Sequence, residues 1–129
     1  MNEIKLLIVD DEEEFATALA ERLEIRGFMP ETAFYGLDGV QTTATFSPDV
    51  VLLDLKMPDM SGIEVLEQIK EKHPAVEVIM LTGHGTGKGG ADFIERGAFG
   101  FIMKPVNFNE LLEKIDAAYQ KKISGSQAS

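Results

Sequence analysis

The sequence predicts an α/β fold, with five parallel strands in a doubly wound sheet of strand order 2-1-3-4-5. Short apolar runs of strand length alternate along the chain with helical patterns, five of each. This alternation is typical of parallel strands that are joined by right-handed crossovers. The second strand contains Pro30, which cannot donate to a ladder and therefore favours an edge of the sheet. With 129 residues, the chain has the length of one domain.

The strands are indicated by short apolar runs that are bounded by turn residues. Residues 50–53, VVLL, have the strongest pattern, because consecutive apolar residues are typical of a strand that is buried on both faces. The turn residues from Met57 to Met60 follow this strand and lead into a helix. The strands are expected at residues 4–9, 28–34, 50–53, 76–81 and 99–103.

The helices are indicated by capping residues and by apolar residues at helical spacing. Ser61 with Glu64 and Asn107 with Glu110 each have the three-residue spacing of a helix N-terminus. The segment 84–91, HGTGKGGA, contains four glycines that disfavour a helix, so we expect the fourth helix to start late or to be mobile. The helices are expected between the first strand and Gly27, at residues 37–45, 61–72 and 90–96, and from residue 107 to about residue 122. Their buried stripes are expected at Phe15, Leu19 and Leu23, at Ile63, Leu66 and Ile69, and at Leu111, Leu112, Ile115, Ala118 and Tyr119.

Composition excludes several classes of function. The formal net charge of −10 argues against direct binding of a nucleic acid, because phosphate contacts need lysine and arginine. The absence of cysteine excludes a disulfide framework, a thiolate nucleophile and a zinc site built on sulfur. No transmembrane run or leader pattern is visible, so we expect a cytoplasmic protein without membrane contact. Residues 124–129 are small and polar, which predicts a domain over residues 1–123 and then a disordered tail or a truncated linker.

Polar residues stand at the carboxyl ends of four predicted strands. Asp10 and Asp11 follow the first strand, Asp54 the third, Thr82 the fourth and Lys104 the fifth. Each has a common alternative role when taken alone: a helix cap for Asp11 or Thr82, and a solvated loop residue for Asp54 or Lys104. In the strand order given above, however, these ends are neighbours along one edge, where open α/β sheets bind ligands. We therefore expect the five side chains to meet in one crevice.

The charges in this crevice indicate its chemistry. Three carboxylates close together repel one another unless a divalent cation or a lysine neutralises them. Ligation by oxygen alone suits Mg²⁺ better than a soft metal, and such a metal favours a phosphoryl group as a further ligand. Asp54 is then the expected nucleophile, with Lys104 and Thr82 supplying positive charge and a hydroxyl group to the transferred oxygens.

Four motifs at these positions match a known family. The stretches IVDD and LLDLKMPDMSG, the Thr82-Gly83 pair and the Lys104-Pro105 pair resemble the receiver domain of bacterial two-component response regulators, from about Ile4 to Ile123. The resemblance implies a flavodoxin-like fold. It also implies a signalling domain that accepts a phosphoryl group from a histidine kinase or a histidine phosphotransfer protein, rather than an enzyme for an external substrate.

The resemblance assigns roles at the site. Asp54 is implied as the phosphoacceptor. Asp11, Asp54 and the main-chain carbonyl of Lys56 are implied as Mg²⁺ ligands, with Asp10 acting mainly through water. Lys104 and Thr82 are implied to hold the phosphoryl oxygens.

Further roles follow from the same resemblance. Phe101 is implied as an aromatic switch that turns inward when Thr82 moves toward the phosphoryl group, although a plain core position is its common alternative. The peptide bond between Lys104 and Pro105 is implied to be cis. Lys56 and His84 occupy places where the family varies the rate at which water attacks the acyl phosphate, so we hypothesise that they tune its lifetime. Solvated loop residues are the alternative for both.

Other functions fit less well. Flavin carriers with this strand order need a hydroxyl- and glycine-rich phosphate loop after the first strand, where this chain has DDEEE. A dehalogenase-type phosphatase needs an aspartate two residues after its nucleophile, where this chain has Lys56. The GTGKGG stretch fails the P-loop pattern because Gly89 follows Lys88. A receiver-like binding module that never takes a phosphoryl group remains an alternative.

The sequence leaves the signalling context open. The glycines from Gly87 to Gly90 fall where receivers have a firm fourth helix, so the geometry of the output surface is uncertain at this stage. The cognate kinase, the output, homodimerisation and the choice between a free-standing regulator and a module of a longer protein all stay open.

Overall fold

The computed structural model describes residues 3–83 and 89–127. One sheet of five parallel strands has the order β2-β1-β3-β4-β5, which confirms the predicted fold class and strand order. The strands are β1 (Lys5–Val9), β2 (Met29–Ala33), β3 (Val50–Asp54), β4 (Glu77–Thr82) and β5 (Gly100–Met103). The helices are α1 (Glu13–Ile25), α2 (Gly36–Phe46), α3 (Gly62–Lys72), α4 (Gly89–Glu95) and α5 (Phe108–Gln127).

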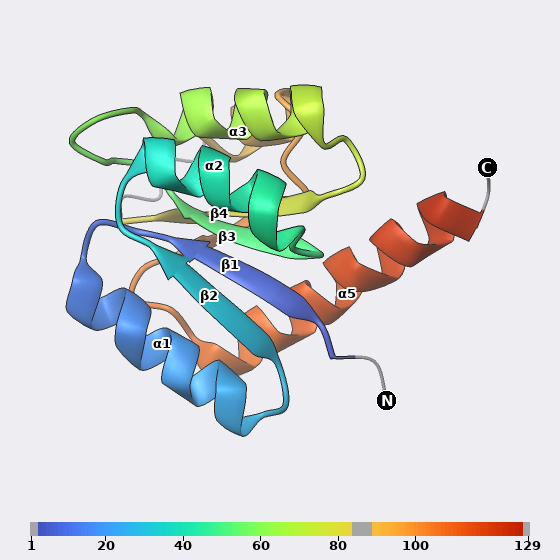
Figure 1. Cartoon of the computed structure of the whole chain (residues 1–129), viewed down its shortest axis with the longest axis horizontal. Helices are drawn as coiled ribbons and strands as arrows, with labels where there is room; N and C mark the ends of the chain where they lie inside the picture. The colour runs from blue at the N-terminus through green and yellow to red at the C-terminus, as the bar shows by residue number, and fades with distance from the viewer. Residues whose placement is uncertain (1–2, 84–88, 128–129) are drawn as a thin grey trace.

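Helices cover both faces of the sheet (Figure 1). Successive strand residues point to opposite faces, so Leu6 and Ile8 of β1 pack with α1 and α5, whereas Leu7 and Val9 pack on the side of α2, α3 and α4. The central strands β1, β3 and β4 are buried on both faces, which explains their unbroken apolar sequences. β2, which contains Pro30, lies at the edge as predicted.

The predicted caps of two helices are confirmed. The Ser61 hydroxyl accepts a hydrogen bond from the Glu64 N–H at 3.2 Å at the start of α3. The Asn107 side chain accepts one from the Glu110 N–H at 2.9 Å, one residue before α5 begins. These bonds satisfy N–H groups that have no partner within the helix, so both helices start where their sequences indicated.

Two details of the helices go beyond the predictions. Ile63, Leu66 and Ile69 pack toward the core as predicted, Ile63 only partly buried, and Val65 is a further, fully buried residue of α3. Residues 124–127, expected as part of a disordered tail or a truncated linker, are helical and continue α5 as far as Gln127. In Figure 1 this end of α5 reaches past the strands.

The glycine-rich segment is described only in part. α4 begins at Gly89, one residue before the predicted start, and the turn after it has a positive φ of 109° at Gly97, the predicted cap. His84 and the other residues up to 88 lie outside the described part of the chain, so the expectation of mobility there is not addressed. Among the described residues, none of the helices combines the length and the apolar character that crossing a bilayer requires.

Candidate functional site

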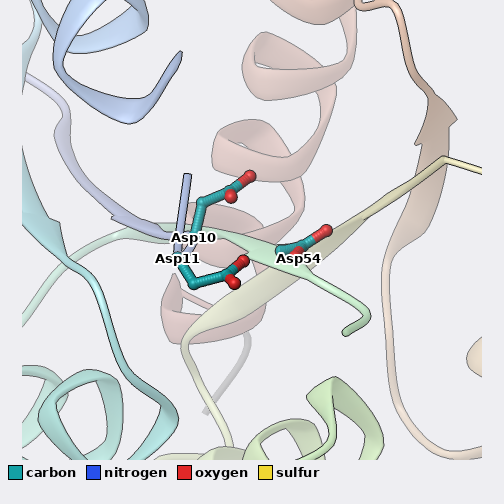
Figure 2. A group of neighbouring side chains, drawn as sticks. All are labelled: Asp10, Asp11 and Asp54. Atoms are coloured by element: carbon teal, nitrogen blue, oxygen red, sulfur yellow. The ribbon is translucent and has the colours of Figure 1, made fainter. Parts of the chain in front are cut away.

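Three aspartates come together at the carboxyl edge of the sheet. Val9 of β1 pairs with Leu53 of β3, so the residues that follow them, Asp10 and Asp54, reach the same edge side by side. One carboxylate oxygen from each of Asp10, Asp11 and Asp54 lies within 4.8 Å of the others. Figure 2 shows the three side chains projecting to the same side. Asp10 is fully buried, Asp54 is 7% exposed and Asp11 is exposed, so the cluster opens to solvent through Asp11.

Local hydrogen bonds turn the chain from β1 into α1 and fix Asp10. Its N–H donates to the Ala33 carbonyl at 3.0 Å, and its side chain accepts from the Glu12 N–H at 2.9 Å. The N-cap of α1 is Glu12, whose side chain makes no cap hydrogen bond. Asp11 is therefore not the N-cap residue of this helix, which was the common alternative for it.

Lys104, the residue after β5, joins the cluster from a distant part of the sequence. Its ammonium group lies 2.8 Å from Asp10 Oδ2 and 3.3 Å from Asp54 Oδ1, as the sequence predicted. It also lies 2.9 Å from Glu12 Oε1 and 4.6 Å from the centre of the Phe15 ring. The predictions did not include Glu12. The sequence feature that could have indicated Glu12 is its place in the acidic run DDEEE, directly after the two site aspartates.

Burial and mutual repulsion shift the pKa values in the cluster. Burial, followed by the charge of Asp10, raises the pKa of Asp54 to about 6. Burial also raises the pKa of Asp10, although its hydrogen bond to Lys104 opposes this shift. Burial disfavours the charged form of Lys104, but hydrogen bonds to Asp10 and Glu12 outweigh that effect and raise its pKa. The carboxylates thus carry more negative charge than one lysine neutralises.

The backbone beside Asp54 is held by a tight loop. The Gly62 N–H donates to the Leu55 carbonyl at 2.7 Å, and a Cβ atom on Gly62 would lie 2.4 Å from the Asp54 carbonyl oxygen. A larger residue at position 62 would therefore displace the chain at Asp54. Lys56 forms an isolated antiparallel bridge with Ser61, which fixes the backbone that carries the Lys56 carbonyl.

A cavity of about 300 Å³ contains most of the predicted site residues. Asp11, Asp54, Lys56, Thr82 and Lys104 all line it, together with Glu12, Leu55 and Gly83. Thr82 is buried at the end of β4, and its carbonyl accepts a hydrogen bond from the Lys104 N–H at 2.7 Å. The predicted meeting of strand ends in one crevice is thereby confirmed.

The remaining predicted residues are Phe101, Pro105 and His84. Phe101 is half-buried in β5 and meets the ring of Phe93 from α4 edge to face, with ring centres 6.2 Å apart. The Lys104–Pro105 peptide bond is cis, as the resemblance implied. His84 falls outside the described residues.

The donor atoms fit a hard divalent cation. Asp10, Asp11 and Asp54 offer oxygen ligands, the kind that Mg²⁺ prefers. Burial, followed by the charge of Asp10, raises the pKa of Asp54, and this disfavours its charged form. A divalent ion supplies positive charge, so the residues of this site fit Mg²⁺ better than a metal that needs sulfur or nitrogen donors.

Comparisons with known proteins give one consistent result. Residues 6–116 match the response regulator receiver domain. The chain is 35% identical over 106 residues to the photosynthetic apparatus regulatory protein RegA of Rhodovulum sulfidophilum, covering 82% of this chain and 58% of that protein. It is 32% identical over 118 residues to the DNA-binding transcriptional regulator NtrC of Escherichia coli K12, covering 89% of this chain and 25% of that protein.

Solved structures agree with the sequence comparison. The CheY-like response regulator receiver domain protein from Methanospirillum hungatei JF-1 has a TM-score of 0.89 at 32% identity, covering 96% of this chain and 99% of that one. A response regulator receiver domain protein from Clostridium thermocellum has a TM-score of 0.86 at 36% identity, covering 92% and 96%. The match over residues 6–116 spans most of the chain. The chain therefore belongs to the response regulator receiver domain family of two-component signalling.

Proposed function

We propose that this receiver accepts a phosphoryl group on Asp54 from the phosphohistidine of a histidine kinase or a histidine phosphotransfer protein, in a reaction that requires Mg²⁺. The observation that supports the proposal is the set of charged groups around the Asp54 carboxylate. This carboxylate lies in the cavity, 3.3 Å from the Lys104 ammonium group and close to two further carboxylates. This arrangement combines an acceptor oxygen, a cation and oxygen ligands for a metal.

The residues of the site have separate roles in the proposed reaction. An Asp54 oxygen attacks the phosphorus atom and forms a P–O bond, while the P–N bond of the phosphohistidine breaks and its electron pair stays on the imidazole nitrogen. Lys104 and the Thr82 hydroxyl hold the transferred oxygens, for which Lys104 turns away from Glu12. Asp11, Asp54 and the Lys56 carbonyl would hold Mg²⁺, with Asp10 acting mainly through water, and the ion would supply positive charge to the phosphoryl oxygens when bound.

The transfer changes the charge at the edge of the sheet. Phosphorylation leaves roughly two negative charges on the Asp54 side chain. This charge draws Thr82 and Lys104 toward it, and Phe101 turns into the space that Thr82 leaves. Because Phe101 contacts Phe93 of α4, its rotation alters the surface formed by β5 and α4. That surface is the proposed output face.

Lys56 and His84 are proposed to set how long the acyl phosphate lasts. The support is that Lys56 lines the cavity containing Asp54, and that His84 is two residues after Thr82. Alanine at both positions should change the dephosphorylation rate, measured by loss of label from the isolated phosphoprotein. An unchanged rate would mean that both are plain loop residues.

The wider context is proposed from the relatives. This chain spans 58% of RegA and 25% of NtrC, so those proteins contain further sequence. We propose a receiver over residues 1–123 that acts in the cytoplasm, without direct nucleic-acid or membrane contact, and passes its signal to an output domain or protein.

The proposal is tested by mass spectrometry of the intact chain. Incubation with acetyl phosphate and Mg²⁺ should add the mass of one phosphoryl group, and chelation of the metal should prevent this. Asp54→Asn should abolish the addition, whereas Asp49→Asn at the opposite edge of the sheet should retain it. Wild-type protein that takes no phosphoryl group from acetyl phosphate or from histidine kinases would instead be a receiver-like binding module.

A further inference from the structure

Asp59, in the loop between β3 and α3, contacts a helix that is distant in the sequence. Its two carboxylate oxygens accept hydrogen bonds from the Gly36 N–H at 2.9 Å and from the Leu37 N–H at 3.0 Å. These are the first residues of α2, whose own N-cap, Tyr35, makes no side-chain cap hydrogen bond. Asp59 therefore caps α2 from a different loop, and the two hydrogen bonds, that from Leu37 first, lower its pKa.

Close packing reinforces this contact. A Cβ atom on Gly36 would lie 2.9 Å from Met60 Cβ and 3.1 Å from a methyl group of Val65, so the start of α2 rests directly on the residue after Asp59. The tip of the loop is thus held against α2 by hydrogen bonds and by packing. A shift of this tip relative to α2 would break both.

The base of the same loop adjoins the phosphoacceptor. The bridge between Lys56 and Ser61 and the hydrogen bond from Gly62 to Leu55 close the loop next to Asp54. Lys56 is part of this base, and Met57 and Pro58 connect it to the tip that Asp59 holds. The position of the Lys56 carbonyl therefore depends on both anchors, of which the tip anchor comes from another part of the chain.

We propose that Asp59 is a positioning residue for the cation site, because it fixes the loop of residues 55–61 to α2 and so holds the Lys56 carbonyl beside Asp54. The inference rests on the proposed function, since it concerns the Mg²⁺ that supports phosphoryl transfer. Asp59 is not among the residues that line the cavity of Asp54, so it acts through the loop. Loss of an outer contact that orients a ligand typically weakens metal binding about 10- to 100-fold.

The test compares two variants of the full chain that each lose a cap. Asp59→Ala removes both bonds to α2, whereas Asn107→Ala removes the cap bond to Glu110 at the start of α5 and leaves the loop of residues 55–61 and α2 untouched. In calorimetric titrations with Mg²⁺, Asp59→Ala should raise the Kd about tenfold. Asn107→Ala should keep the wild-type Kd. With acetyl phosphate as donor, Asp59→Ala should need about tenfold more Mg²⁺ for the half-maximal rate and should reach the wild-type rate at saturation.

Hydrogen exchange shows whether the contact itself is broken. The amides of Gly36 and Leu37 should exchange faster in Asp59→Ala than in the wild type. Asp59→Asn, which keeps one acceptor oxygen, should fall between them in exchange and in Kd. Faster exchange with an unchanged Kd for Mg²⁺ would overturn the inference and leave Asp59 as a helix cap alone. Wild-type protein that binds no Mg²⁺ and takes no phosphoryl group would refute the proposed function itself, and the inference with it.

Discussion

The acidic residues at the two edges of the sheet differ in how many lysine ammonium groups lie near them. At the carboxyl edge, Asp10, Glu12 and Asp54 share the ammonium group of Lys104, and Asp11 lies beside them. At the amino edge, Asp49 precedes β3 and Glu77 begins β4, and each has lysine partners of its own. The same strands thus present carboxylates at both ends, with different counter-charges.

The amino edge is held by ion pairs. Asp49 accepts a hydrogen bond from the Lys5 N–H at 2.9 Å and pairs with Lys122 of α5. The buried Glu77 oxygen lies 3.7 Å from the Lys121 ammonium group and 4.0 Å from that of Lys70. These contacts tie α5 to the strands. Two carboxylates face three lysine ammonium groups in these contacts, so positive charge is not short at this edge.

The comparison indicates that charged residues at the amino edge stabilise the fold, whereas those at the carboxyl edge form the candidate site. Ion pairs at the amino edge hold a helix in place. At the carboxyl edge, burial, followed by the charge of Asp10, raises the pKa of Asp54 to about 6, so an added cation would stabilise the charged form of this carboxylate. Groups with shifted pKa values are common at functional sites.

Replacing one lysine at each edge should give the largest difference in phosphorylation rate between two variants. Lys104→Met should slow phosphorylation by acetyl phosphate about 10²- to 10³-fold, because the transferred oxygens lose a preorganised cation. Lys122→Met removes a lysine from the amino edge and should leave the rate unchanged. Mass spectrometry over time gives both rates. Equal rates for the two variants would contradict the assignment of function to the carboxyl edge.

Mg²⁺ should stabilise the protein through the carboxyl edge alone. At 100 times its Kd, a ligand that binds only the folded state raises the free energy of unfolding by about 2.7 kcal/mol. Asp11→Ala should lose this gain, whereas Asp49→Ala should retain it from a lower starting stability. Urea titrations with and without Mg²⁺ measure the gain. If Mg²⁺ raised the free energy of unfolding of neither Asp49→Ala nor Asp11→Ala, the distinction between the two edges would be wrong.

A smaller effect is expected in the pH dependence of the metal-free protein. Asp54 has a higher pKa in the folded state than in the unfolded chain, so the folded state binds the proton more tightly between pH 3.8 and about 6. The free energy of unfolding should therefore fall as pH rises through this window, by on the order of 1 kcal/mol after allowance for solvent screening. Asp54→Asn should lack this part of the decline, and Asp49→Asn should keep it. Urea titrations in the presence of a chelator test this, and identical profiles for Asp54→Asn and the wild type would refute it.

The sequence by itself determined the fold class and the core of the site. Apolar runs predicted the strands because a parallel strand buried on both faces needs apolar residues throughout. The site residues were predictable because the carboxyl ends of parallel strands lie along one edge, which brings Asp10, Asp54, Thr82 and Lys104 together. The caps at Ser61 and Asn107 were predictable because their partners are three residues away.

Only the tertiary structure decided the contacts between distant side chains. Glu12 meets Lys104 across 92 residues, Asp59 caps α2 across 22, and Lys122 meets Asp49 across 73. Periodicity and capping rules describe neighbours within about one helical turn, so they carry no information on such pairs. These pairs form because the packing of helices on the sheet brings the side chains within reach. In the contacts described, that packing gathers more carboxylates than lysines at the carboxyl edge and more lysines than carboxylates at the amino edge.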